Sequence, residues 1–375
     1  MGTTFAWTFH VPDFSPLRFF SIDRGAQAMS CELTTKYLGL ELVSPVVVGA
    51  CPLNTQPETV RQLVGAGAGA IVLPSMLQEQ VVHQQMKSTD PANAIQRSGY
   101  QPQQDRYNGG TEVYLQTIAR LKEICTVPVI GSLNGSSPGQ WLQYAKEIES
   151  AGADALEFNL QQAVFDPLET SNDVETRMCE LVRQVRELVS IPVAAKISQR
   201  YTNLSSMTAQ LQRVGVSGLV LFTHLPQWDV STDRMHWTIH WELSPINTLG
   251  GILEGIVRAR AGDRTISIAA SGGISNAEDS LKSMIAGADV VMITSAVYRE
   301  GPDVIRDIVD GIVRHLEETQ YQSLQAFRDA CPTDHVGDEK SVRLEYVDPL
   351  TRSDTYFDPT PLVSQQSGDS YGHPN

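Results

Sequence analysis

Short apolar runs alternate with amphipathic segments along most of this chain. Each run is nearly continuous in Val, Ile, Ala and Leu, which is typical of parallel strands covered on both faces. The segments between the runs carry apolar residues at helical spacing, for example Met178, Val182 and Val185 after the fourth run. The runs lie at residues 45–50, 70–73, 127–132, 154–159, 192–197, 217–222, 266–271 and 289–294.

Four stretches of the sequence repeat the same transition from a helix to a strand. The stretches "GAGAGAIVL", "SAGADALEFN", "RVGVSGLVLF" and "IAGADVVMIT" each end a helical pattern on glycine and then enter an apolar run. Glycine is expected there because the left-handed conformation at a helix end costs it little. Eight alternations of strand and helix predict a (β/α)8 TIM barrel. An open doubly wound sheet is the alternative.

Several segments fall outside the eightfold pattern. "LTTKYLGLEL" before the first run predicts an N-terminal hairpin, and residues 78–110 form an insertion after the second strand. The expected divisions are an N-terminal extension at 1–28, the barrel at 29–330 and a polar C-terminal tail at 331–375.

The two ends of the chain are expected to lie outside the barrel. The first 28 residues hold aromatics but neither a signal-peptide run nor a spanning segment. A disordered extension is expected, with a membrane-touching arm as the alternative, and Met29 reads like a natural start. The polar tail is expected to be an ordered arm or disordered.

The net charge and the cysteine content limit the classes of partner and of metal or disulfide site that the sequence allows. Lys and Arg number 28 and Asp and Glu number 43, so the net charge is 28 − 43 = −15. Such an acidic chain repels nucleic acid and anionic lipid, which leaves small molecules as the expected partners. The five scattered cysteines contain no CxxC pair, so neither a disulfide framework nor a metal site is indicated. A reducing cytoplasm fits this pattern.

Two neighbouring strand ends are rich in backbone donors. "SGGI" ends the seventh run and "ITSAVY" the eighth, where TIM barrels often hold phosphate. Gly272 and Gly273 let a ligand approach the backbone, and Asn276 is placed to cap the next helix. Thr294 and Ser295 add further donors. A plain tight turn is the alternative to an anion site.

Lys196 and Asn159 are polar residues at the ends of two other strands. Lys196 is expected to be a cation in the barrel mouth, serving as an electrostatic anchor or as a Schiff-base lysine. A lysine that simply reaches solvent is the alternative. Asn159 is either a ligand-facing amide or a strand-end cap.

The chain resembles the dihydroorotate dehydrogenases. The resemblance is carried by "LTTKYLGLELVSPVVVGACPL", "GADALEFNL", "PVAAKIS", "ASGGISNAEDSLKSMIAGADVVMITSAVYREGP" and "YQSLQAF", and it spans residues 33–330. It implies a TIM barrel that holds FMN non-covalently over the strand ends.

The resemblance also assigns residues by position. Gly49 and Ala50 would lie along the flavin ring, and Ser75 would contact it. Asn159 would hydrogen-bond flavin or substrate, and Lys196 would stabilise the negative charge of the reduced ring. The FMN phosphate would be held by Gly272, Gly273, Thr294 and Ser295.

The substrate motifs of the family are altered. The family's Cys or Ser base is missing from "NLQQAVFDP", where Gln161 and Gln162 stand, and Pro74 replaces a lysine. "SGYQPQQDRYNGG" stands in place of the substrate-clasping segment, and "FTHLPQWD" in place of an Asn-Ser pair.

Three residues are candidates for the missing acid–base group, and a fourth lies where it could meet the flavin. His224, Tyr107 and Asp105 are possible acid–base groups, and each is open to a merely structural interpretation. Cys51 either faces the flavin or only packs.

The expected function is FMN-dependent oxidation of dihydroorotate to orotate in pyrimidine biosynthesis, or of a related CH–CH substrate. Lys196 and His224 are the predicted catalytic residues. The alternatives are a flavin-binding barrel without orotate turnover and a flavin-free aldolase-type lyase that uses Lys196. The resemblance also suggests a homodimer.

Overall fold

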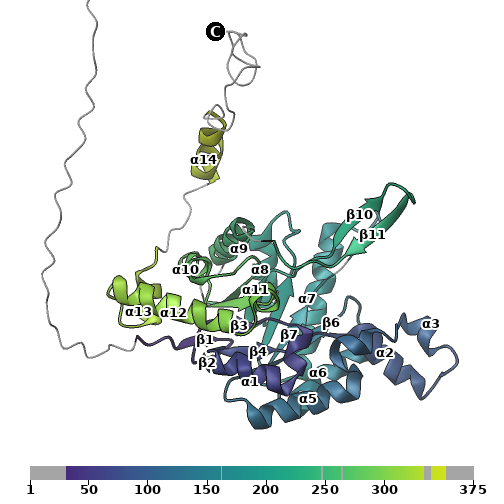
Figure 1. Ribbon diagram of the computed structural model, residues 1–375. Coiled ribbons are helices and arrows are strands. Elements are labelled where there is room, and N and C mark those ends of the chain that lie inside the picture. Colours follow the sequence, from purple (N-terminus) through teal and green to yellow (C-terminus); the bar gives the residue numbers. More distant parts are fainter. Residues whose placement is uncertain (1–30, 162, 246–247, 263–264, 333–338, 352–375) are drawn as a thin grey trace, which may run out of the picture. The chain divides into compact units, whose positions relative to one another are not determined.

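The apolar runs form a parallel barrel that closes on itself (Figure 1). In the computed structural model the strands follow the order β4-β3-β13-β12-β9-β8-β7-β6, and β4 pairs with β6 to complete the ring. This closure confirms the TIM barrel and excludes the open doubly wound sheet. The strands are β3 (Val46–Val48), β4 (Ala70–Val72), β6 (Val129–Asn134), β7 (Ala155–Asn159), β8 (Val193–Ile197), β9 (Gly218–Leu221), β12 (Ser267–Ser271) and β13 (Val290–Ile293).

The structure describes residues 31–161, 163–245, 248–262, 265–332 and 339–351. The predicted extension at 1–28, the start at Met29, Gln162 and most of the tail lie outside these residues. The described part of the tail contains helix α14 (Glu339–Thr351). The domain boundaries at 28 and 330 stay predictions.

Helices pack around the outside of the barrel (Figure 1). Their apolar faces and the outward side chains of the strands form the larger core cluster. None of the described helices is both long and apolar enough to cross a membrane. The barrel helices are α1 (Pro57–Gly65), α5 (Gly110–Ile124), α6 (Tyr144–Ser150), α7 (Ser171–Leu188), α8 (Leu204–Arg213), α9 (Leu249–Gly262), α10 (Ala277–Ile285) and α12 (Asp303–Glu318).

The predicted N-terminal hairpin closes one end of the barrel. Strands β1 (Thr35–Tyr37) and β2 (Leu40–Leu42) pair antiparallel, and Tyr37, Leu38 and Leu42 pack into the barrel interior. The backbone N–H of Leu38 donates to Ser267 Oγ at 3.0 Å. Because Ser267 begins its strand, the hairpin occupies the amino end of the barrel, and the carboxyl ends of the strands are left for a ligand.

The predicted insertion after β4 is a helical segment fastened to the barrel. It follows β5 (Met76–Leu77) and contains α2 (Gln78–Lys87), α3 (Ala94–Ser98) and α4 (Gln104–Asn108). Asn108 Nδ2 donates to the carbonyl of Ser75 at 3.0 Å, and Gln80 Nε2 donates to Asn108 Oδ1 at 2.8 Å. These bonds hold α4 beside the end of β4.

A second addition was not predicted. Strands β10 (Gln227–Ser231) and β11 (His236–His240) form an antiparallel hairpin between β9 and α9, and the hairpin projects from the barrel (Figure 1). Trp228 pairs with Ile239, and Val230 pairs with Trp237, all of them exposed. The residues that follow β11 lead back to the mouth of the barrel.

Asp289 joins three segments at the amino end of the barrel. Its carboxylate accepts hydrogen bonds from Arg260 of α9 at 2.8 Å and from Arg328 of α13 (Leu324–Ala330). It also accepts from the backbone N–H of Ile268 at 2.7 Å. All three charged side chains are at most 20% exposed, so removal of the carboxylate leaves two largely buried arginines without this partner.

We therefore expect Asp289→Ala to lower the free energy of unfolding by about 3 kcal/mol, measured by urea denaturation. Glu41→Ala is the matched control, because Glu41 pairs with Lys36 on an exposed hairpin and its loss should leave stability nearly unchanged. Equal effects of the two substitutions would contradict this interpretation.

Candidate functional site

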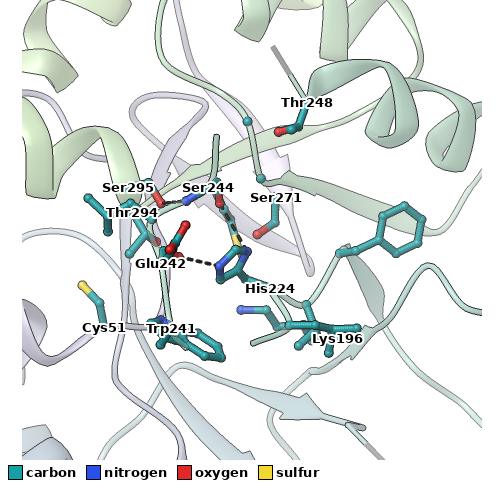
Figure 2. A pocket seen from close by; sticks show the side chains of 18 of the residues that line it. Cys51, Lys196, His224, Trp241, Glu242, Ser244, Thr248, Ser271, Thr294 and Ser295 are labelled. Carbon is teal, nitrogen blue, oxygen red and sulfur yellow. Dashed lines mark hydrogen bonds between the residues drawn. The ribbon is translucent and has the colours of Figure 1, made fainter. Parts of the chain in front are cut away.

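A cavity of about 740 Å³ opens at the carboxyl ends of the strands (Figure 2). Its wall is built from the residues that follow β3, β9, β12 and β13, from the ends of β7 and β8, and from the segment between β11 and α9. Both its size and its position are typical of cofactor and substrate sites in TIM barrels.

Most of the residues predicted from sequence meet in this cavity. Gly49 and Asp105 do not line it. An added side chain on Gly49 would lie 2.6 Å from Thr294 Oγ1, so Gly49 backs the threonine. Asp105 is bound to Tyr100 Oη at 2.5 Å within the insertion. The predicted residues that do line it are Ala50, Cys51, Ser75, Tyr107, Asn159, Gln161, Lys196, His224, Gly272, Gly273, Thr294 and Ser295.

Gly272 and Gly273 form a recess that only glycine fits. Their φ angles are +113° and +67°, a region that other residues rarely adopt. A Cβ on Gly273 would lie 2.6 Å from Thr248 Oγ1 and 3.1 Å from the backbone nitrogen of Leu249. Neither glycine amide donates to another group within the described part of the chain. Two open N–H groups in a narrow recess favour an anion over a simple turn.

The residues around this recess shape it further. Asn276 Oδ1 accepts from the backbone N–H of Asp279 at 2.9 Å, so Asn276 caps α10 as predicted. Ser295 Oγ accepts from the backbone N–H of Ser244 at 2.9 Å, which ties the wall after β11 to the end of β13 (Figure 2). The recess itself is bounded by the 248–252 segment, where Thr248 and Leu249 face Gly273 and Ile252 faces Gly272.

Lys196 lies on the cavity floor and forms an ion pair with a buried carboxylate beneath it. Its Nζ lies 3.3 Å from Oε1 of Glu157, a carboxylate that is 1% exposed. Glu157 was not predicted from the sequence. A signal was present, since the residue interrupts an apolar run two positions before Asn159, and residues two apart share a strand face. The pairing favours a charged lysine.

His224 is bound to the segment that crosses the cavity mouth (Figure 2). Its Nε2 lies 2.6 Å from the carbonyl oxygen of Glu242, and its Nδ1 lies 3.5 Å from Ser244 Oγ. A carbonyl only accepts, so Nε2 carries the hydrogen. The ring also meets Trp241 edge-on at 5.0 Å. This geometry favours a positioning role over proton abstraction.

Three further side chains in the cavity hold protons tightly. Burial raises the pKa of Cys51 to about 11, although hydrogen bonds from the backbone of Leu53 and Asn54 lower it in part. Burial also raises the pKa of Tyr298 to about 12 and that of Tyr107 still further. At neutral pH these groups are protonated, so they can donate hydrogen bonds but are poorly suited to abstracting a proton.

Comparison with known proteins agrees with this architecture. The family model "Dihydroorotate dehydrogenase" matches residues 32–316. An Aeropyrum pernix protein, named provisionally as a dihydroorotate dehydrogenase A (fumarate), is 28% identical over 78% of this chain and 95% of its own length. A catalytic subunit of dihydroorotate dehydrogenase B (NAD(+)) from Methanocaldococcus jannaschii is 25% identical over 77% of this chain and 94% of its own.

The family match covers well over half of the sequence and includes every strand of the barrel. The cavity, the glycine recess and Lys196 all lie within the matched residues. The chain therefore belongs to the dihydroorotate dehydrogenase family of flavin-dependent oxidoreductases.

Proposed function

We propose that this chain binds FMN in the barrel-mouth cavity and uses it to oxidise dihydroorotate to orotate, or to act on a related CH–CH bond. The observation that carries the proposal is the pairing, in one cavity, of the Gly272–Gly273 recess with the cation Lys196. The recess suits a phosphate, and the cation suits a ring that gains negative charge.

The residues present fit FMN. The amides of Gly272 and Gly273, with Thr294 and Ser295 beside them, would hold the phosphate. Ala50 offers the small surface that a flat ring needs. FMN would supply a hydride acceptor, which no side chain of the cavity provides.

The cavity's own residues would position the ligand and keep water out. Lys196 holds a positive charge at the floor, and Asn159 Oδ1 accepts from Thr223 Oγ1 at 2.9 Å, which orients its amide group. His224 keeps the segment after β11 over the mouth. Cys51 and Tyr107 stay protonated at Sγ and Oη, so neither supplies the base that would accept the proton lost from the substrate.

The assignment of dihydroorotate as the substrate rests on the family. Because residues of the cavity wall differ from the family's substrate motifs, a related substrate is the second candidate. Gln161 lines the cavity near the point where the family's Cys or Ser base would stand. A glutamine amide cannot abstract a proton at neutral pH. The family assignment replaces the flavin-free lyase, while flavin binding without orotate turnover remains an outcome of the test below. The homodimer stays a prediction from the resemblance.

The function is tested by adding dihydroorotate to the FMN-loaded protein without oxygen. We expect loss of the oxidised-flavin absorption, because electrons pass from the substrate to the cofactor. Dithionite is the control that shows the bound FMN to be reducible. A spectrum that dithionite bleaches and dihydroorotate leaves unchanged would remove dihydroorotate as the substrate.

The glycine recess is tested by Gly273→Ala, which places a Cβ against Thr248 and Leu249. We expect the Kd for FMN, measured by quenching of flavin fluorescence, to rise at least about tenfold, or about 1.4 kcal/mol.

Gly39→Ala is the matched control for this substitution. Gly39 also has a positive φ, +79°, but an added Cβ there has nothing within 4 Å, and the residue lies in the hairpin at the opposite end of the barrel. Its FMN affinity should equal that of the wild type. Unchanged affinity in Gly273→Ala would place the phosphate elsewhere.

A further inference from the structure

Glu157 is a carboxylate buried inside the barrel beneath the cavity floor. It lies in the middle of β7, and its neighbours on the same strand face are Ala155 and Asn159. Ala155 packs into the barrel interior, and Asn159 lines the cavity. Its side chain is 1% exposed. A buried charge of this kind is costly unless a partner compensates it.

Two hydrogen-bonding routes connect Glu157 to the cavity. Its Oε1 lies 3.3 Å from Lys196 Nζ and 3.4 Å from Ser132 Oγ. Ser132 Oγ lies 2.7 Å from Ser75 Oγ, and both Ser75 and Lys196 line the cavity. Glu157 therefore lies below two points of the floor.

The two members of the ion pair are exposed to the cavity to different extents. The Lys196 side chain is 12% exposed and reaches the cavity, whereas Glu157 is sealed below it. The pair therefore presents its positive end to the cavity and its negative end to the barrel interior. In a surrounding of low dielectric constant, both charges act on a ligand bound above them.

Among the described side chains, Lys196 is the only cation within ion-pair distance of Glu157. Tyr37 packs into the interior from the hairpin, and burial keeps its pKa well above the usual value. It is therefore neutral. Glu157 Oε2 has no hydrogen-bond partner among the described residues. The carboxylate thus depends on Lys196 for charge compensation.

We propose that Glu157 is a positioning residue that holds the Lys196 ammonium at the cavity floor, offsets its charge and so sets the reduction potential of FMN bound above it. The inference rests on the proposed FMN site. FMN gains negative charge on reduction, and an isolated cation beneath it would favour the reduced form. Glu157 weakens that preference, so that the cofactor can also return to the oxidised form.

The test is a charge cycle on the FMN-loaded protein. The midpoint potential of the bound flavin is measured in the wild type, Glu157→Gln, Lys196→Gln and the double variant. Glu157→Gln should have the highest potential, because it leaves the cation without its offset. Lys196→Gln should have the lowest, and the double variant should lie between it and the wild type.

The expected size of the first effect is at least a tenfold change in the ratio of affinities for reduced and oxidised flavin. For a two-electron couple that ratio corresponds to about 30 mV. A potential in Glu157→Gln that equals or falls below the wild-type value would overturn the proposal. If that variant fails to fold, a double variant with a potential no higher than that of Lys196→Gln would do the same.

Ser132→Ala separates charge from structure. It removes the hydroxyl between Glu157 and Ser75 but changes no charge, so the potential should stay near the wild-type value even if stability falls. A shift as large as that of Glu157→Gln would show that local packing, and not the carboxylate charge, controls the potential. A wild-type protein that binds no FMN would instead overturn the proposed function.

Discussion

Closure of the parallel barrel is the constraint on which the site depends. The strands all run in one direction around the ring, so their carboxyl ends gather at one rim. The hairpin at the other end leaves that rim as the open face of the barrel. Residues as distant in sequence as Ala50 and Ser295 therefore meet in one cavity, and the two long additions complete its wall.

The chemistry of the cavity is divided between backbone and side chains. The proposed anion site consists of the backbone amides of Gly272 and Gly273, whose positive φ angles disfavour larger residues. The cation in the same cavity is a side chain, Lys196, which pairs with the buried carboxylate of Glu157. In the proposed FMN site, the backbone amides would fix the phosphate, whereas the ion pair would tune the bound ring without reshaping the cavity.

Sequence patterns gave the strands and most of the cavity because near-continuous apolar runs and strand-end glycines have direct physical causes. Side-chain direction and local partners depend on three-dimensional contacts that these patterns do not contain. An added Cβ on Gly49 would meet Thr294, so Gly49 lies behind that threonine. Asp105 accepts a hydrogen bond from Tyr100 within the insertion. The hairpin at 227–240 has exposed apolar side chains and lacks the continuous apolar run of a buried strand.

A crystal structure of the protein with FMN would test the central claim most directly. The phosphate should lie within hydrogen-bonding distance of the Gly272 and Gly273 amides, with the flavin ring over the ammonium of Lys196. A phosphate bound away from the two glycines, or a ring out of reach of Lys196, would contradict the proposed division between the backbone anion site and the paired cation.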